Sequence, residues 1–212
     1  KKEGYIFVQE NFDEIDLPLK EICKKINEKI EFPMFVKPSN SGSSVGVKKA
    51  NNIGELEKAI ENAGQYDTKI LVEQGIKGKE VECAVLECDK KDDILASTVG
   101  EVKPAEEFYS FDAKYNIPES KTIIPAQIEN NQIEEIRRLA VRAFKAIDGS
   151  GLSRVDFFIE NGTNKIYINE INTMPGFTKI SMYPKLFESD KISYSELLDI
   201  LINYAINKFD FT

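Results

Sequence analysis

The chain has 212 residues and a formal net charge of −8, with 42% hydrophobic and 30% charged residues, which are ordinary globular proportions. The acidic balance argues against a nucleic-acid-binding or anionic-membrane-binding surface, because either needs a basic face. No apolar run approaches the roughly 20 residues that would span a bilayer, and no signal-peptide pattern is present.

The sequence contains no histidine. This excludes Ser-His-Asp and Cys-His catalysis and histidine-ligated metal sites, so any chemistry must use carboxylates, lysine, arginine, tyrosine and backbone groups. Oxygen ligands favour magnesium over zinc. Cys23, Cys83 and Cys88 are odd in number and lack CxxC spacing, which argues against a disulfide framework or zinc site and favours a reducing cytoplasm.

The first part of the chain alternates strand and helix patterns. Ile22, Ile26 and Ile30 recur at helical spacing and predict a helix from about residue 16 to 28. Residues 39–44 are all small and polar and predict a flexible hairpin tip. We also expect strands at 5–9, 32–37, 45–48 and 69–74 and a helix at 53–63. Because the chain opens as a linker without an initiator methionine, we expect a fragment or a processed chain.

Gly75 and Gly78 loosen the chain after the strand at 69–74, so we divide it into an α+β unit over 1–78 and a second over 79–212. The form Ser193-x-x-Glu196 is a capping box that opens the last helix. Segment 106–120 has no clean periodicity and reads as a long loop, a common form for a functional lid. The other elements expected are strands at 80–87, 94–102, 152–159 and 165–171 and helices at 131–147 and 194–208.

The main candidate site combines Asp156, inside an apolar run, with Glu170 and Asn172 on the next strand. An acid in an apolar run is costly unless something offsets its charge, and a divalent cation commonly does so. Arg154 shares a strand face with Asp156, as Glu170 does with Asn172. The alternative is that both acids lie exposed on a half-solvated hairpin, with Arg154 as a salt-bridge partner.

The length of the turn between these strands decides between the alternatives. A three-residue turn at 162–164 would set Asp156 opposite Glu170 and Arg154 opposite Asn172. An even-length turn would send the acids to opposite faces. A metal site therefore predicts an odd-length turn, with Arg154 as a planar donor to a developing oxyanion.

Three further segments could contact a nucleotide. Lys37 could reach a phosphate oxygen beside the small residues at 39–44, although a Ser/Gly hairpin tip is often only a turn. Residues 73–76 could offer backbone groups to an adenine edge, and Glu80 could accept from ribose hydroxyls. The aromatic loop at 108–115 could be a lid that brings Lys114 to the γ-phosphate and Tyr115 to the substrate, or a loop fastened to the core by its aromatics.

Five motifs together resemble the ATP-grasp ligases, and within them the D-alanine–D-alanine ligases. They are FVKPSNSGSSVGV at 35–47, EQGIKGKE at 73–80, FYSFDAKY at 108–115, SRVDFF at 153–158 and NEINTMPGFTKISMYP at 169–184. They follow the family order and run nearly end to end. The resemblance implies an α+β fold of the ATP-grasp type, in which two α+β subdomains with antiparallel sheets grip ATP.

The resemblance also implies roles for single residues. ATP contacts would come from Lys37, Ser43, Ser44, Glu73, Gln74, Ile76, Glu80, Phe108 and Lys114, and two magnesium ions (manganese being a possible substitute) would be held by Asp156, Glu170 and Asn172. Arg154 and the Gly176 backbone N–H would form the oxyanion site, and Tyr115, Ser181 and Met182 would lie on the substrate side.

The implied reaction joins two D-alanines through a D-alanyl phosphate, for peptidoglycan precursors made in the cytoplasm. Met182 and Tyr115 favour D-alanine as second substrate, with D-alanyl-D-serine ligation or a non-catalytic ATP-binding module as alternatives. Family members carry a preceding N-terminal domain with further substrate contacts that cannot be assigned here. We therefore expect little activity from this chain alone, no nucleic-acid or membrane partner, and a possible homodimer.

Overall fold

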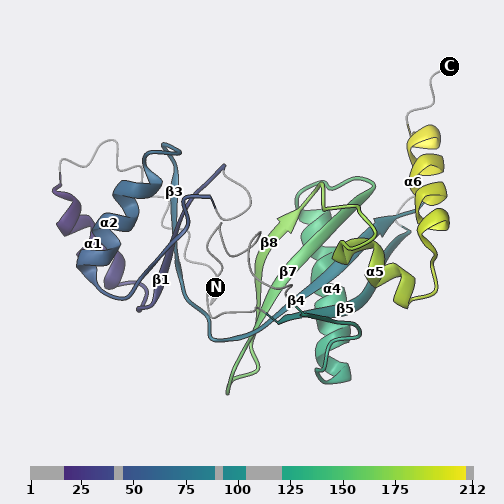
Figure 1. The fold of residues 1–212 in the computed structure, drawn as a ribbon, viewed down its shortest axis with the longest axis horizontal. Coiled ribbons are helices and arrows are strands. Elements are labelled where there is room, and N and C mark those ends of the chain that lie inside the picture. Colours follow the sequence, from purple (N-terminus) through teal and green to yellow (C-terminus); the bar gives the residue numbers. More distant parts are fainter. Residues whose placement is uncertain (1–16, 41–44, 89–92, 104–120, 209–212) are drawn as a thin grey trace. The chain divides into compact units, whose positions relative to one another are not determined.

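This computed structural model describes residues 17–40, 45–88, 93–103 and 121–208, which form two compact units that divide between Ile76 and Lys77 (Figure 1). Each unit combines an antiparallel sheet with helices, which confirms the α+β class. The strand expected at 5–9 lies outside the described residues. No helix in the described ranges is long and apolar enough to cross a membrane.

The first unit has a three-stranded sheet in the order β2-β1-β3. Its elements are α1 (Leu19–Asn27), β1 (Met34–Pro38), β2 (Lys48–Ala50), α2 (Ile53–Ala63) and β3 (Ile70–Gln74). Residues 34 and 36 of β1 are fully buried, and their neighbours 35 and 37 are half-buried, which is the period-two pattern of a strand with one core face. Cys23 and Ile26 of α1 and Leu56 of α2 complete this core.

The return strand expected at 45–48 begins only at Lys48. Gly46 has φ +75°, in a turn, and a Cβ there would lie 2.8 Å from the Pro38 ring. A left-handed backbone with no room for a side chain ends the strand geometry at this point, so residues 45–47 form the end of the hairpin connection.

The second unit has a five-stranded antiparallel sheet in the order β6-β5-β4-β7-β8. Its elements are β4 (Gly78–Glu87), β5 (Ile94–Lys103), β6 (Lys121–Ile123), α4 (Asn130–Ala146), β7 (Leu152–Glu160), β8 (Ile166–Asn172), α5 (Met182–Ser189) and α6 (Tyr194–Lys208). The sequence patterns anticipated all of these except β6 and α5.

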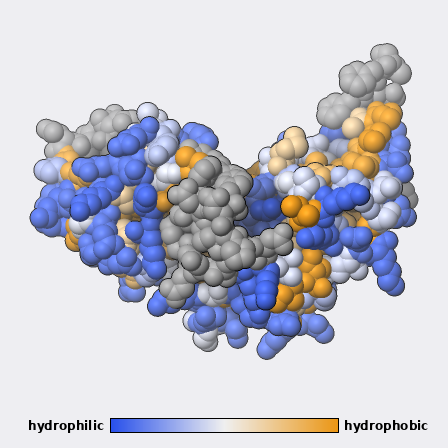
Figure 2. Space-filling view, viewed as in Figure 1, coloured by the Kyte–Doolittle hydropathy of each residue, from blue (hydrophilic) through white to orange (hydrophobic). Residues whose placement is uncertain are grey.

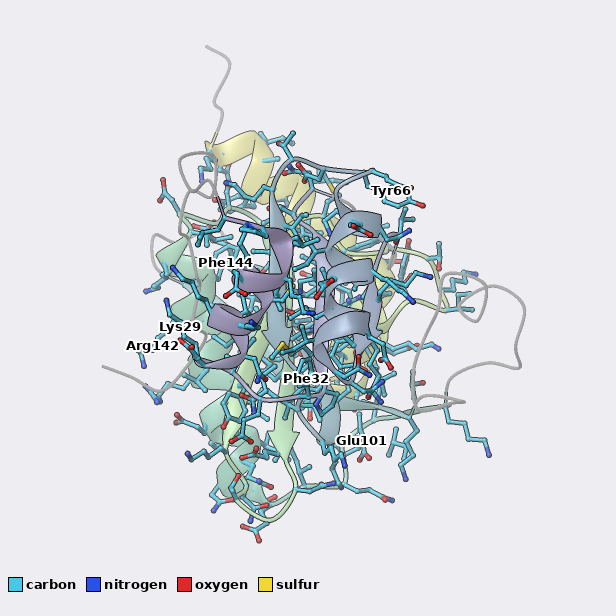
Figure 3. The ribbon with its side chains drawn as sticks, turned by 90° about the vertical axis from the view of Figure 1, so that its left-hand side faces the viewer. Lys29, Phe32, Tyr66, Glu101, Arg142 and Phe144 are labelled. Carbon is cyan, nitrogen blue, oxygen red and sulfur yellow. The ribbon has the colours of Figure 1, made fainter. Side chains whose placement is uncertain are left out.

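The two faces of this sheet have different coverings. Helix α4 packs Phe144, labelled in Figure 3, and its apolar neighbours against alternate residues of β4 and β7, such as Val81 and Phe157. On the opposite face, Tyr183 of α5 packs against β4, and its hydroxyl donates to the Val85 carbonyl at 3.0 Å. Arg154 and Asp156 of β7 lie on this second face, because they pair with Ala84 and Glu82 of β4 and Ala84 packs with Tyr183.

Helix α6 begins as its capping box predicts. The Ser193 N–H and hydroxyl donate to the Glu196 carboxylate at 2.8 and 2.7 Å, and the Glu196 N–H donates back to the hydroxyl at 3.3 Å. Farther along α6, Leu198, Ile202 and Ile206 are exposed at a spacing of four residues. Apolar residues accordingly gather along α6 on the molecular surface (Figure 2).

Candidate functional site

Three carboxylates form one row across adjacent strands of the second unit. Glu82 of β4 lies opposite Asp156 of β7, which lies opposite Glu170 of β8. In the next row, Ala84 lies opposite Arg154, which lies opposite Asn172. Directly opposed residues of antiparallel strands share a face, so the expected pairing of Asp156 with Glu170 and of Arg154 with Asn172 is confirmed.

A β-bulge, and not the expected odd-length turn, produces this register. Near the turn, Ile159 pairs with Ile166 and the Glu160 N–H donates to the Lys165 carbonyl, which leaves the four residues 161–164 as the connection. The expectation of an odd-length turn is therefore wrong. A register shift follows in β8, because Phe157 pairs with Ile168 while Asp156 pairs with Glu170, so Asn169 has no partner. This bulge returns the acids to one face.

Arg154 lies between two of the acids. Its Nε and Nη2 donate to the two oxygens of Asp156, both at 2.7 Å, in a bidentate pair. Its Nε also lies 3.0 Å from Oε2 of Glu82, although the N–H is not aligned for a hydrogen bond to that atom. Burial opposes the charge of Arg154, but its bonds to Asp156 and the nearby Glu82 raise its pKa overall. Arg154 therefore stays protonated.

The site holds more buried acid than one arginine can offset. Asp156 is 3% exposed and Glu82 is 7% exposed. Burial, and next the charge of Asp156, raise the pKa of Glu82 to about 8. Burial also raises the pKa of Asp156, against the opposing effect of Arg154. Raised pKa values on clustered acids indicate a site short of positive charge, which a bound cation would supply.

The donor set fits a cation that prefers oxygen. The Asn172 amide donates to Asp156 at 3.0 Å and to Glu170 at 3.5 Å, so the three side chains meet. No cluster of three or more His, Cys, Asp or Glu in the described residues has a metal-holding arrangement. Two carboxylates and one amide would therefore need further oxygen ligands, and nucleotide phosphates are of that kind.

Glu82 is the residue that the sequence analysis missed. The segment Val81-Glu-Cys-Ala-Val85 places an acid inside an apolar strand, the same signal that singled out Asp156. A search for every acid in an apolar run would have found it.

The segment after β8 positions Gly176 beside Ser181. A Cβ on Gly176 would lie 3.0 Å from the Ser181 hydroxyl oxygen, so a side chain there would crowd that group. The same oxygen accepts from the Thr178 N–H at 3.1 Å. Met182 is 7% exposed and packs in the core under α5, against Gly100. Its side chain therefore faces the protein interior.

In the first unit, Lys37 of β1 forms an ion pair with Glu73 of β3, with Nζ 2.9 Å from Oε2. Both side chains are partly exposed on the sheet face away from the helices. Gln74 is exposed and Ile76 half-buried at the end of this unit, while Glu80 belongs to β4 of the second unit. Ser43, Ser44, Phe108, Lys114 and Tyr115 lie outside the described residues.

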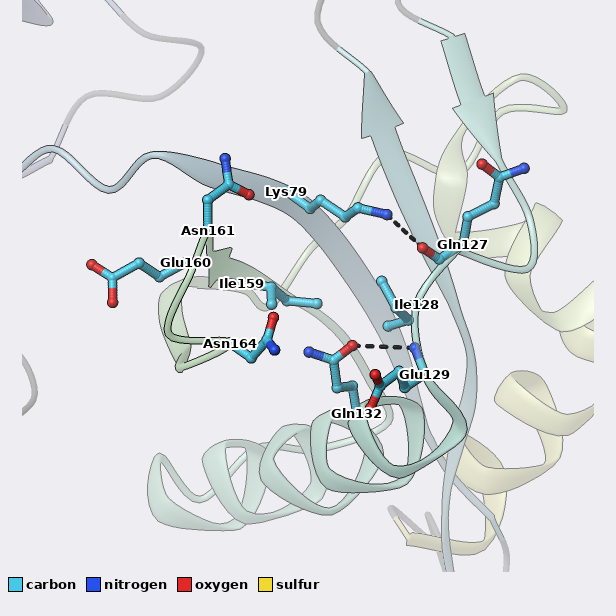
Figure 4. A pocket seen from close by; sticks show the side chains of 9 residues that line it. All are labelled: Lys79, Gln127, Ile128, Glu129, Gln132, Ile159, Glu160, Asn161 and Asn164. Carbon is cyan, nitrogen blue, oxygen red and sulfur yellow. Dashed lines mark hydrogen bonds between the residues drawn. The ribbon is translucent and has the colours of Figure 1, made fainter.

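A separate pocket lies on the α4 face of the second unit (Figure 4). It is lined by Lys79, Gln127 and Asn161 among others, and Lys79 donates to the Gln127 carbonyl. Lys79 lies opposite Ile159, a core residue beneath α4, so this pocket and the acid row occupy opposite faces of the sheet. Within the pocket, the Glu129 N–H also donates to the Gln132 side chain at 3.1 Å.

Comparison with known proteins relates most of the chain to one family. A family model described as "D-ala D-ala ligase C-terminus" matches residues 4–203. The chain is 55% identical over 189 residues to a D-alanine–D-alanine ligase of Acetivibrio thermocellus, covering 89% of this chain and 50% of that protein. It is 45% identical over 208 residues to a D-alanine–D-alanine ligase of Clostridium acetobutylicum, and the match covers 98% of this chain and 59% of that protein. The chain thus spans about half the length of the curated relatives it matches.

Solved structures agree on the fold. The VanG D-Ala:D-Ser ligase of Enterococcus faecalis superposes with a TM-score of 0.77 at 38% identity, over 87% of this chain and 53% of that one. The D-alanine–D-alanine ligase of Coxiella burnetii superposes with a TM-score of 0.77 at 34% identity, over 92% of this chain and 51% of that one. These matches confirm the ATP-grasp fold.

Proposed function

Because this chain belongs to the D-ala D-ala ligase C-terminus family, we propose that it is the ATP- and substrate-handling part of a D-alanine–D-alanine ligase. The observation that carries the proposal is the shared face of Arg154, Asp156, Glu170 and Asn172, which a bulge at Asn169 restores. Such a face combines oxygen ligands for a phosphate-bound cation with a fixed guanidinium donor.

The proposed reaction has two steps. The carboxylate of one D-alanine takes the γ-phosphoryl group of ATP and forms an acyl phosphate. The amine of a second D-alanine then displaces phosphate and forms the peptide bond. Both steps spread negative charge over oxygen atoms, so positioned positive groups lower both barriers.

The residues of the second unit divide this work. Asp156, Glu170 and Asn172 would hold two magnesium ions, which would neutralise phosphate charge. Arg154, held in a bidentate pair, would donate to the oxyanion of the peptide-forming step together with the Gly176 N–H. Ser181 would lie beside the second D-alanine. Glu80 would accept from the ribose hydroxyls.

The residues of the first unit would bind the nucleotide. Lys37 would contact a phosphate, and because Glu73 holds its ammonium group at 2.9 Å, ATP must compete with that ion pair. Glu73, Gln74 and Ile76 would contact adenine. Ser43, Ser44, Phe108, Lys114 and Tyr115 keep the roles that the resemblance implies.

The cellular setting follows from the same proposal. A D-alanyl-D-alanine product would serve peptidoglycan synthesis, and an ATP-dependent enzyme whose three cysteines form no disulfide fits the cytoplasm. An N-terminal domain would complete the substrate site, and the intact protein is a possible homodimer.

Phosphate release with ATP and D-alanine, alone or with added D-serine or D-lactate, tests the proposal in protein that includes the N-terminal half. We expect D-alanine alone to sustain turnover. Arg154→Lys should lower turnover about 100-fold, because a lysine cannot reproduce a bidentate donor. The matched control is Arg138→Lys, since Arg138 is exposed and pairs with Glu135 of its own helix; turnover should change less than about twofold.

The panel also separates the alternatives. Preference for D-serine would support a D-alanyl-D-serine ligase, the activity named for the Enterococcus faecalis neighbour. Binding of ATP without phosphate release under any condition would support a non-catalytic module and contradict the proposed ligase.

A further inference from the structure

Glu82 has a buried oxygen whose hydrogen-bonding capacity is unused. The residue is 7% exposed, and Oε2 has no hydrogen-bond partner. A buried carboxylate oxygen left without a partner costs free energy. Such an atom indicates that another arrangement of the site would satisfy it.

Among the described residues, Glu82 has one candidate partner. On the β5 side its neighbour is Gly100, where the side chains of Met182 and Leu186 lie within 2.9 Å of a Cβ position and fill the space. On the β7 side lies Arg154, with Nε 3.0 Å from Oε2. In the described part of the chain, Arg154 is the one basic group with an ion-pair distance to Glu82.

Asp156 meanwhile has most of its lone-pair positions occupied. A carboxylate offers about four lone-pair positions. Arg154 uses two of them, and the Asn172 amide uses a third at 3.0 Å. A cation that binds Asp156 through both oxygens must displace part of this set. A cation at the one remaining position would lie beside the guanidinium on the same carboxylate, and the two positive charges would repel each other.

We propose, on the basis of the function proposed above, that Glu82 is a positioning residue that receives Arg154 when Asp156 binds a divalent cation. The guanidinium exchanges one carboxylate for the next in the same row, and no covalent bond changes. The exchange satisfies Oε2 of Glu82, opens Asp156 to the cation and keeps Arg154 at the site as a donor. Without Glu82, the cation and Arg154 compete for one carboxylate.

Manganese binding to this chain with ADP, followed by the EPR signal of unbound Mn²⁺, tests the exchange without relying on turnover. Glu82→Gln keeps the shape of the side chain but cannot form the carboxylate that would pair with Arg154, and it should weaken Mn²⁺ binding about tenfold. The matched control is Glu101→Gln, which removes a buried acid from the opposite face of the same sheet and should change binding less than about twofold.

A double-mutant cycle separates the exchange from a simple loss of negative charge. With Arg154→Met, no guanidinium competes for Asp156, so adding Glu82→Gln should change Mn²⁺ binding less than about twofold. An equal weakening in both backgrounds, or none in the wild-type background, would overturn the proposal. Absence of Mn²⁺·ADP binding in the wild-type chain would instead refute the proposed function, and this inference with it.

A second measurement needs no variant at position 82. Arginine occurs only at positions 137, 138, 142 and 154, so the Arg154 Nε–H resonance can be assigned by comparison with Arg154→Lys. Adding Mg²⁺ to the ADP-bound chain should shift this resonance and leave the Arg138 resonance in place. An unmoved Arg154 resonance in a Mg²⁺-saturated sample would also overturn the exchange.

Discussion

At the scale of single residues, the candidate site depends on charge balance in a buried place. Asp156, Glu82 and Arg154 share one sheet face, and the pKa values of both acids are raised mainly by burial. The sequence identified Asp156 and Arg154 because both lie in a short apolar run with a carboxylate motif downstream. It did not identify Glu82, although that acid also lies in an apolar run; the strand pairing then places Glu82 opposite Asp156.

Burial also controls the reactivity of the cysteines, and this leads to a prediction. Cys23 and Cys83 are fully buried, and burial raises the pKa of Cys23 to about 11 and of Cys83 to about 12. Because the thiolate is the reactive form, both should resist a disulfide reagent at pH 8, whereas the half-buried Cys88 should react. Mass spectrometry after brief labelling should find modification at Cys88 alone, and at all three after unfolding in urea. Early labelling of Cys83 in folded protein would contradict this packing.

At the scale of elements, the β7–β8 hairpin shows how a register is set. The four-residue connection alone would pair Asp156 with Asn169, and the bulge shifts that pairing to Glu170. Core packing explains why the bulge lies where it does. Between the turn and the bulge, Ile168 lies opposite the fully buried Phe157 and packs into the α4 core.

Single deletions in β8 test this explanation. Removing Asn169 takes away the residue that has no partner in β7. Ile168 should still pair with Phe157 and Glu170 with Asp156, so Mn²⁺·ADP binding should persist. Removing Tyr167 instead draws Asn169 opposite Phe157 and buries an amide in the core, which should cost on the order of 2 kcal/mol or more. Urea unfolding and Mn²⁺ titration of both deletions are the measurements. Equal damage from the two deletions would show that the bulge itself is required.

Most other elements followed from sequence patterns, and the exceptions have physical reasons. The helix at 53–63 and the last helix agree with the structure because their caps and apolar periodicity are local signals. Strand β6 has only three residues, too few for a visible alternation. Helix α5 contains Pro184 in its first turn, where proline is tolerated, but its core-facing side chains made a short apolar run without clear periodicity.

At the scale of the whole molecule, the chain forms two units with separate cores and spans about half the length of its curated relatives. We predict that these 212 residues alone bind ATP but release phosphate at about one hundredth or less of the rate of protein with the N-terminal half, since substrate positioning governs turnover. Nucleotide binding by calorimetry and phosphate release in parallel test this. Turnover at the full rate by this chain would show that it needs no further domain.

The sequence by itself determined the α+β class, the family and most helices and strands, because these depend on periodicity, caps and motifs that are local in the chain. It also paired Asp156 with Glu170, although through a turn of the wrong length. Only the tertiary structure decided that a bulge sets this register, that Glu82 joins the acid row and that Met182 turns into the core. Each of these depends on contacts between strands and helices far apart in sequence, where packing selects among pairings that local patterns leave equivalent.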